Sequence, residues 1–379
     1  MKRSLNIVLF ASLIAGCSSD SGAPSFTQSE ETCGAQNLGY WAAEELHVTG
    51  LASNALHHKD GWLYVVESRD NTISTWDIEL EQYSPFADLG NDQNPYDLFV
   101  GSGVVWVTNY IGRTVSQITQ GGENVDAWAA PSFRNPSGVA EFAGHLWVTD
   151  VNYISPSQGF GPSTVVKRNL ETDEEEVIEM AFLNTQFADV FQLGDEEVLV
   201  LTSTGAVQFV DRKAMATSSG AVDVIASDGT MRTVEFPVPS PQRSGALSRP
   251  AQPPGSKYLY FTSATAPEIY KLDLETLTWV RGPEDPIVLY ESEEDTLHHI
   301  SAGPDGMLYV TAFNTDEIWR VDTRCDEVLA EPVKVGRSSL LEGPHMIQVV
   351  DAPEGGVDAY YLLSLSNRLG RVKFRPSQN

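Results

Sequence analysis

The sequence is poor in cysteine, in positive charge and in long apolar runs. Three cysteines among 379 residues are too few for the disulfide framework of a small secreted domain. The 24 lysines and arginines are outnumbered by 52 acids, and the resulting net charge of −28 repels phosphate backbones. We therefore expect no nucleic-acid partner. No apolar run approaches the 18 residues that a membrane-spanning helix needs.

Signatures of common enzyme chemistry are also missing. The chain has no Gly-x-Ser-x-Gly or Ser-x-x-Lys nucleophile motif and no His-Glu-x-x-His zinc motif. No amphipathic helical stretch competes with the strand patterns described below. Hydrophobic residues make up 41% of the chain, which is enough for a packed core and excludes wholesale disorder.

The N-terminus has the pattern of an export signal. Basic residues at Lys2 and Arg3 precede an apolar run from Leu5 to Ala15, which is too short to remain in a bilayer as a spanning helix. The run ends Leu13-Ile14-Ala15-Gly16-Cys17 and resembles the bacterial lipoprotein signal. The resemblance implies cleavage before Cys17 and lipid attachment to its sulfur. Ser18 after the cysteine resembles the signal for outer-membrane sorting.

These features give an expected address and domain organisation. We expect a signal peptide over residues 1–16, a flexible polar tether over 17–32 and one folded domain over 33–379. The protein would be lipid-anchored in the outer membrane, on its periplasmic side or at the cell surface, with lipid as its only membrane attachment. A second interpretation is a soluble secreted protein whose signal happens to end in cysteine. We expect a monomer.

A strand pattern recurs seven times and predicts the fold. An aromatic or apolar strand appears at steps of 41 to 61 residues. Its copies centre on Tyr64, Trp106, Trp147, Leu199, Tyr260, Tyr309 and Tyr361. Glycine turns such as Asp60-Gly61 precede it, and in three repeats the third strand ends in an aspartate, interpreted as a turn former (Asp77, Asp273, Asp322). The pattern predicts an all-β, seven-bladed β-propeller, and a stack of β-sandwiches is the alternative.

The last repeat predicts how the ring closes. From Pro344 to Phe374 there is room for only three strands, so we expect a strand from residues 40–48 to complete the blade. Cys33 precedes this closing strand and Cys325 follows the third strand of the sixth repeat. Both would lie on the bottom face, on neighbouring blades. In an oxidising periplasm we expect a disulfide between them, and two unpaired thiols are the alternative.

Two short motifs resemble those of known propellers. Trp106-Val107-Thr108-Asn109 and Trp147-Val148-Thr149-Asp150 resemble the bacterial surface propellers named for a Tyr-Val-Thr-Asn repeat. The segment from Asn135 to Ala140 resembles the repeat start of NHL proteins and of streptogramin-lyase-like propellers. The resemblance covers residues 40–375 and implies the fold. These families include binders, lyases and lactonases, so it implies no single activity.

The inner strand of each blade begins at the top face, around the axis. We place these starts at seven residue pairs: Ser53-Asn54, Tyr96-Asp97, Ser137-Gly138, Ala188-Asp189, Ser244-Gly245, His298-His299 and His345-Met346. Asn109 and Asp150 follow second strands in the same region. His57 and His58 are placed lower on their strand and are interpreted as structural. The loop from Asp150 to Ser163 is long enough to cover an axial site or to be decoration.

Three hypotheses follow for these axial residues. The histidines and aspartates could satisfy backbone groups and water, could bind a small polar ligand or a divalent metal, or could catalyse with histidine as general base. Streptogramin-lyase-like propellers use histidine at such a channel mouth. They also tend to carry a glutamate after the aromatic strand, and in this sequence only Glu67 matches that glutamate. The leading hypothesis is a scaffold for a small polar ligand or an envelope protein. The alternative is a lyase or lactone hydrolase.

Overall fold

The structure, a computed structural model, describes residues 38–40, 43–155, 158–210, 213–237, 246–291, 297–329, 331–336 and 341–376. Every regular element within these ranges is a β-strand. No helix among them is long and apolar enough to cross a membrane. The expected all-β class is confirmed.

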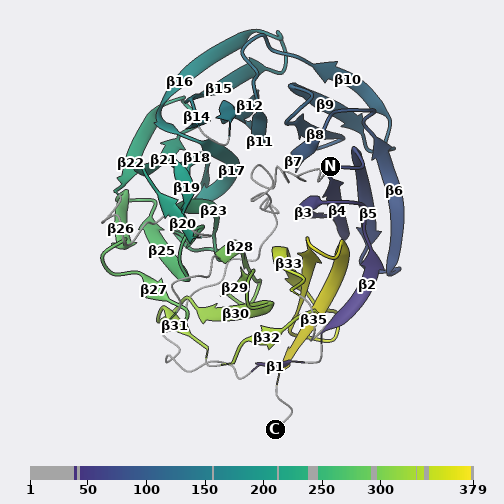
Figure 1. The fold of residues 1–379 in the computed structure, drawn as a ribbon, viewed down its shortest axis with the longest axis vertical. Helices are drawn as coiled ribbons and strands as arrows, with labels where there is room; N and C mark the ends of the chain where they lie inside the picture. Colours follow the sequence, from purple (N-terminus) through teal and green to yellow (C-terminus); the bar gives the residue numbers. More distant parts are fainter. Residues whose placement is uncertain are drawn as a thin grey trace, which may run out of the picture.

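Seven antiparallel sheets form the blades of a propeller (Figure 1). The first two blades are β3 (Ser53–Lys59), β4 (Trp62–Glu67), β5 (Thr72–Asp77), β6 (Gln82–Asp88) and β7 (Pro95–Val100), β8 (Val104–Asn109), β9 (Thr114–Thr119), β10 (Asn124–Trp128). The next two are β11 (Pro136–Phe142), β12 (His145–Asp150), β15 (Pro162–Asn169), β16 (Glu175–Leu183) and β17 (Thr185–Leu193), β18 (Glu196–Ser203), β21 (Gly220–Ile225), β22 (Met231–Phe236).

The remaining three blades carry small additions at their outer edges. The fifth is β23 (Leu247–Ala251), β24 (Tyr258–Ser263), β25 (Glu268–Asp273), β26 (Thr278–Arg281) with β27 (Ile287–Val288). The sixth is β28 (Leu297–Ala302), β29 (Met307–Ala312), β30 (Glu317–Asp322), β31 (Glu327–Val328) with β32 (Val333–Lys334). The seventh is β33 (Pro344–Asp351), β34 (Val357–Leu363) and β35 (Arg368–Pro376).

The ring closes as the sequence predicts. Each inner strand contacts the inner strand of the next blade, and β33 contacts β3. Two N-terminal strands, β1 (Leu38–Tyr40) and β2 (Glu44–Val48), pair with β35 and complete the last blade. The radial arrangement of the blades leaves only short, protected sheet edges as sites for pairing with other chains.

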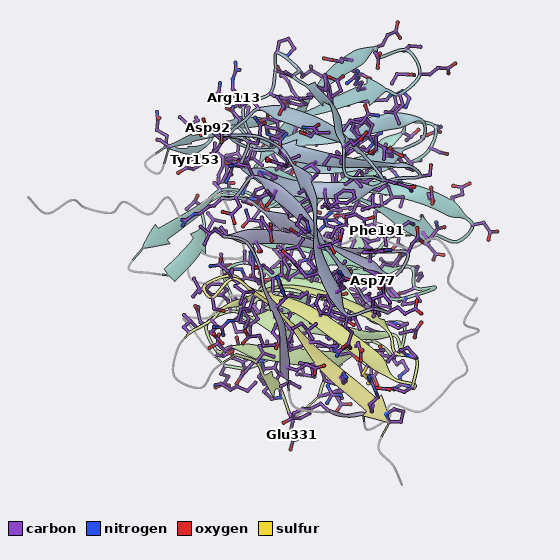
Figure 2. The ribbon with its side chains drawn as sticks, turned by 90° about the vertical axis from the view of Figure 1, so that its right-hand side faces the viewer. Asp77, Asp92, Arg113, Tyr153, Phe191 and Glu331 are labelled. Carbon is purple, nitrogen blue, oxygen red and sulfur yellow. The ribbon has the colours of Figure 1, made fainter. Side chains whose placement is uncertain are left out.

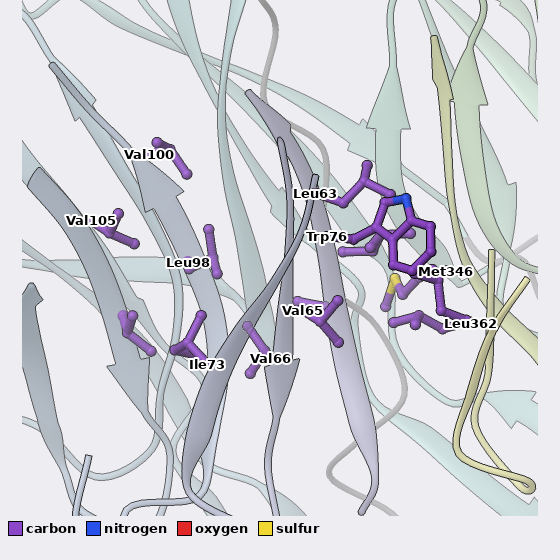
Figure 3. Packing of buried hydrophobic residues seen from close by; sticks show 14 of the residues in the cluster. Leu63, Val65, Val66, Ile73, Trp76, Leu98, Val100, Val105, Met346 and Leu362 are labelled. Carbon is purple, nitrogen blue, oxygen red and sulfur yellow. The ribbon is translucent and has the colours of Figure 1, made fainter. Parts of the chain in front are cut away.

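Apolar side chains between neighbouring blades form the core. One cluster joins Met346 and Leu362 of the seventh blade to Leu63 and Trp76 of the first, and it continues to Leu98 of the second (Figure 3). These side chains are at most 4% exposed. Because each blade buries its two faces only against its neighbours, the packing itself requires the ring to be complete.

The turns between strands follow the chemistry expected from their residues. Gly61 and Gly306 have φ of 81° and 78° in the predicted hairpins, where a side chain would be strained. Asp77 Oδ1 accepts hydrogen bonds from the N–H groups of Glu79 and Leu80 just after β5. Asp273 and Asp322 hold the equivalent turns. The interpretation of these aspartates as turn formers is confirmed.

An extra strand pair and Cys325 lie outside the regular blade pattern. β19 (Val207–Val210) pairs with β20 (Lys213–Ala216), and the turn at residues 227–229 joins β21 to β22. Cys325 lies in the turn between β30 and β31. Cys17 and Cys33 lie outside the described residues, so lipidation of Cys17 and the Cys33–Cys325 disulfide stay predictions.

Candidate functional site

In all seven blades, the pairing between the inner strand and the second strand shifts register near the first residue of the inner strand. The pairing of each inner strand with the second strand of its blade is irregular after the first bridge. The breaks begin at Asn54, Tyr96, Ser137, Gln186, Ser248, His298 and His345. Breaks of this kind re-aim side chains and are common beside functional sites. They place a ring of mostly polar residues around the axis at one end, the top face.

In the second, third and sixth blades, a threonine of the second strand stabilises the break and joins the inner strand to that of the next blade. Thr108 Oγ1 accepts from Asp97 N at 3.1 Å and donates to Ser137 O of the next inner strand. Thr149 and Thr311 make the same bridges, from Gly138 N to Gln186 O and from His299 N to His345 O. The threonine of the Tyr-Val-Thr-Asn-like motif thus satisfies an N–H group that the break frees and holds adjacent inner strands together.

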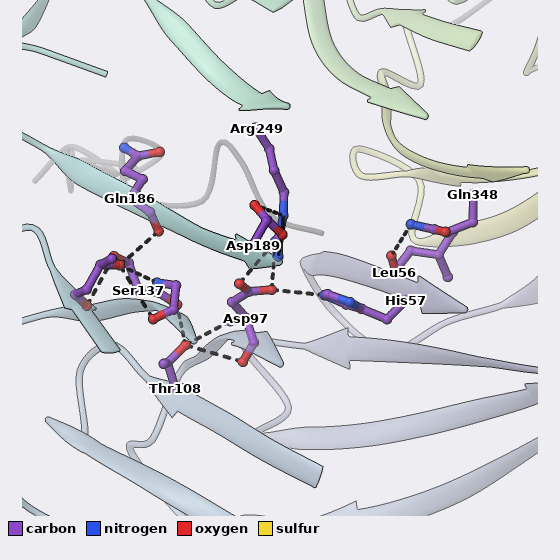
Figure 4. A network of polar contacts seen from close by, with 11 residues as sticks. Leu56, His57, Asp97, Thr108, Ser137, Gln186, Asp189, Arg249 and Gln348 are labelled. Carbon is purple, nitrogen blue, oxygen red and sulfur yellow. Dashed lines mark hydrogen bonds and ion pairs between the residues drawn. The ribbon is translucent and has the colours of Figure 1, made fainter. Parts of the chain in front are cut away.

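Below the breaks, four charged or polar side chains from four blades meet at the axis (Figure 4). Arg249 of β23 donates from Nε to Asp189 of β17 at 2.8 Å and from Nη1 to Asp97 of β7 at 3.0 Å. His57 of β3 donates from Nε2 to Asp97 Oδ1 at 2.9 Å. All four are at most 3% exposed. We call His57, Asp97, Asp189 and Arg249 the axial network.

The axial network holds more acid than base. Burial opposes ionisation of Asp97, but Arg249 and then His57 outweigh burial and lower the pKa of Asp97. Burial lowers the pKa of His57, which Asp97 offsets only in part. Burial raises the pKa of Asp189 to about 7 despite the attraction of Arg249. At neutral pH the network therefore holds one full anion, one cation, a neutral imidazole and a half-protonated carboxyl group.

Asp189 should make stability depend on pH. Its pKa is near 4 in the unfolded chain and about 7 in the fold, so the folded state holds a proton that the unfolded state loses between these pH values. The free energy of unfolding should fall as pH rises through this window, by at most about 1.4 kcal/mol per pH unit from this group. We expect Asp189→Asn to flatten the profile in urea unfolding at pH 5 and pH 8. Profiles of identical slope for the two proteins would contradict this assignment.

The predicted histidines do gather at the top of the ring. The rings of His298 and His345, from neighbouring blades, lie 5.2 Å apart at 64°, and His298 stacks on Phe313 at 4.4 Å. Both histidines are at most 5% exposed. Burial, then His345 and His299, hold the pKa of His298 well below its ordinary value, so this imidazole is neutral at pH 7. His299 lies one position lower, with its Nδ1 facing Ile347 N at 3.4 Å.

Aromatic side chains extend this site outward over the second and third blades. Tyr96, at the break of β7, packs on Tyr110 with ring centroids 5.3 Å apart. Tyr110 and Tyr96 form a small cluster with Val151, against which Tyr153 and Phe160 pack. Tyr153 and Phe160 belong to the hairpin of β13 (Tyr153–Ser155) and β14 (Gly159–Phe160). Tyr153, Asp92 and Arg113 lie toward the same face in Figure 2, whereas Asp77 lies toward the other.

Other predicted site residues have different places. Asp97 and Asp189 belong to the axial network below the breaks rather than to the rim. Asn109 donates to Thr114 and Ser116 of its own blade. Asp150 accepts from the N–H groups of Arg134, Asn135 and Asn152 and so holds loops. Asn54, at a break and 4% exposed, makes no side-chain hydrogen bond within the described part of the chain.

Neither Arg249 as an axial residue nor the role of His57 in the axial network was predicted from the sequence. Blade four begins at Thr185, three residues before the expected Ala188, and the expected start of blade five at Ser244 lies outside the described residues. Counted from the first residue of the observed break in its strand, Asp97 and Arg249 each lie one residue further along. His57 and Asp189 each lie three residues further along. Positions one and three share a strand face, which is the signal that could have found the network.

Metal binding has no clear geometric support. Among the residues that the structure describes, no group of three or more histidine, cysteine, aspartate or glutamate side chains is arranged to hold a metal ion. Glu342, three residues before His345 in the chain, is paired with Arg368 at 2.8 Å. The divalent metal considered from the sequence stays untested.

Comparisons with known proteins identify the fold. No family model and no curated protein sequence matches the chain. Among solved structures it is similar to a streptogramin B lyase (TM-score 0.63, 16% identity, 89% of this chain and 97% of that one). A catalytically inactive histidine-to-alanine variant of virginiamycin B lyase from Staphylococcus aureus with quinupristin gives TM-score 0.61 and 15% identity over 91% and 98% of the chains.

A luciferin-regenerating enzyme is also similar, with TM-score 0.51, 13% identity and coverage of 88% and 95%. At these identities the similarity concerns the fold, in which distinct functions occur. The chain is a seven-bladed β-propeller whose architecture is that of the streptogramin lyase-like proteins.

Proposed function

We propose that the top of the ring binds a small polar ligand, on a lipid-anchored envelope protein. The observation that carries the proposal is the register break at the start of every inner strand. The breaks gather Asn54, Tyr96, His298 and His345 around the axis, above the axial network. A few polar groups that converge beside aromatic side chains are typical of small-molecule sites.

Three arginines favour a ligand with a negatively charged group. Arg69, Arg113 and Arg134 are exposed on top-face loops of three consecutive blades. None of the three side chains makes an ion pair within the described residues, whereas most other described basic residues do. The loops are joined, because Gln93 O accepts from Ile111 N and Asn135 Nδ2 donates to Tyr110 O. In a chain of net charge −28, this local excess of guanidinium groups would favour a ligand that carries a negatively charged group.

The test is a thermal-shift panel of neutral sugars, dicarboxylates and quinupristin. We expect a ligand from the panel, most readily a carboxylate, to raise Tm, since a ligand at 100 times its Kd adds about 2.7 kcal/mol. His298→Phe and His345→Phe keep an aromatic ring at each position but remove the imidazole nitrogens, and should abolish the rise. His145→Gln, at the first residue of β12 and at the other end of its blade, should leave it intact. A rise that survives both phenylalanine variants would refute the site.

The alternative is a lyase or lactone hydrolase that uses the same histidines. The names of the similar structures and the paired rings of His298 and His345 favour it. The depressed pKa of His298 makes it a weak base, and general-base catalysis works best near the ambient pH. Incubation of the full chain with quinupristin, followed by chromatography and mass spectrometry, separates the two functions. A product that depends on His298 or His345 would establish the enzyme.

A further inference from the structure

A cavity lies toward the outer strands of the last blade, and its lining residue Glu342 is three residues before His345 in the chain. It has a volume of about 150 Å³ and lies between the closing strand β2, the strands β34 and β35, and the connection that enters β33. We call it the side cavity. Its polar lining consists of Glu44, Glu45, Glu342, Tyr361 and Arg368. At about 30 Å³ per water molecule it has room for an organic molecule of a few heavy atoms.

The charges that line the side cavity are mainly negative. Glu342 pairs with Arg368 Nη1 at 2.8 Å, and Glu45 lies 3.4 Å from Arg368 Nε. Glu44 is held from the outside by Arg371 at 2.6 Å and by Lys373 at 3.4 Å. The guanidinium group of Arg368 therefore faces two carboxylates, those of Glu45 and Glu342, and a cationic group would be attracted there.

Two polar groups of the lining have no hydrogen-bond partner in the described chain. Tyr361 is 2% exposed, and its hydroxyl group makes no hydrogen bond to the described residues. Arg368 Nε is buried and makes none either, because 3.4 Å to Glu45 is beyond ordinary hydrogen-bond length. Leaving such groups unsatisfied is costly, and a bound oxygen acceptor would satisfy both.

Two glycines keep the side cavity open. A Cβ atom at Gly370 would lie 2.4 Å from Cζ of Tyr361 and 2.5 Å from its hydroxyl oxygen. A Cβ atom at Gly336 would lie 2.5 Å from Glu342 Oε2, and its φ of 88° further favours glycine. The space beside the Tyr361 hydroxyl group and the Glu342 carboxylate therefore depends on missing side chains.

We propose that the side cavity binds a small primary amine that also carries an oxygen acceptor, such as an amino alcohol or an α-amino acid. The ammonium group would donate to the carboxylates of Glu45 and Glu342. The oxygen would accept from the Tyr361 hydroxyl and from Arg368 Nε. This site shares no residue with the axial site and does not depend on the function proposed there.

The test is calorimetric titration of the full chain with 2-aminoethanol and L-serine, and with 1-propanol and propylamine as probes that lack one group. We expect saturable millimolar binding of 2-aminoethanol or serine, weaker binding of propylamine and none of 1-propanol. Tyr361→Phe removes only the hydroxyl group and should weaken binding about fivefold, which corresponds to one hydrogen bond. Glu45→Gln, at an exposed position, should weaken it similarly, and Tyr258→Phe in the fifth blade should not.

The relative affinities of the two main probes identify the ligand class. Tighter binding of serine indicates an amino acid, and tighter binding of 2-aminoethanol indicates an amino alcohol. Absence of saturable binding by both overturns the proposal. So does equal affinity of wild type, Tyr361→Phe and Glu45→Gln, since these variants are folded if their Tm values match that of Tyr258→Phe. Neither result bears on the His298 and His345 variants tested above.

Discussion

Replacing Arg249 with methionine should lower the free energy of unfolding by about 3–5 kcal/mol. The change leaves Asp97 and Asp189 buried at the axis without their shared cation, and an uncompensated buried charge is among the most destabilising defects in a protein. Urea unfolding at pH 8 measures the loss, because Asp189 is then ionised in the wild type. Arg232→Met, at an exposed position of the outer strand β22, should change stability by less than about 0.5 kcal/mol.

A triple variant distinguishes loss of charge balance from loss of packing. Asp97→Asn and Asp189→Asn added to Arg249→Met remove both orphaned charges, so the triple variant should be more stable than Arg249→Met alone. The coupling would show that the axial network acts as a unit. Equal stability of the single and triple variants would show that the loss comes from the missing arginine packing, including its contact with the ring of Phe187.

Replacing Gly138 with alanine is the second change with a large expected effect. A Cβ atom there would lie 2.6 Å from Gln186 O and 2.7 Å from Ala188 N, both backbone atoms of the next inner strand. Backbone cannot rotate away as a side chain can, so the third and fourth blades would have to separate. We expect a loss of about 3 kcal/mol in urea unfolding.

Gly121→Ala is the matched control for this change. Its nearest neighbour to a new Cβ atom is Thr119 Oγ1 at 3.6 Å, which is ordinary contact. It should cost less than about 1 kcal/mol. If Gly138→Ala proves as mild as Gly121→Ala, the inner strands tolerate a wider ring than the structure shows, and the axial geometry would be less tightly determined than we infer.

The fold could be predicted from the sequence because its signals are local and repeated. Strand alternation, glycine turns and strand-end aspartates each recur, and the short last repeat indicates closure by an N-terminal strand. The start predicted for the inner strand of the fourth blade was wrong, and the reason is also local. β16 passes into β17 through Asn184 alone, at φ 58°, so a single turn-forming residue marks where the inner strand begins.

The axial site could be predicted only in part. His298 and His345 stand at the starts of adjacent inner strands, so their meeting follows from the topology. Arg249 was missed because a single arginine in a strand is usually exposed, and its partners are 60 and 152 residues away in sequence. Such pairings depend on the exact register of four blades. A one-residue error in any of them moves the side chain to the other face.

The crystal structure of the full chain with the panel member that raises Tm most tests the central claim directly. We predict that the ligand lies on the axis at the top face, in contact with His298, His345 and Asn54, with the axial network intact beneath it. A ligand bound at the bottom face or on an outer strand would contradict the claim.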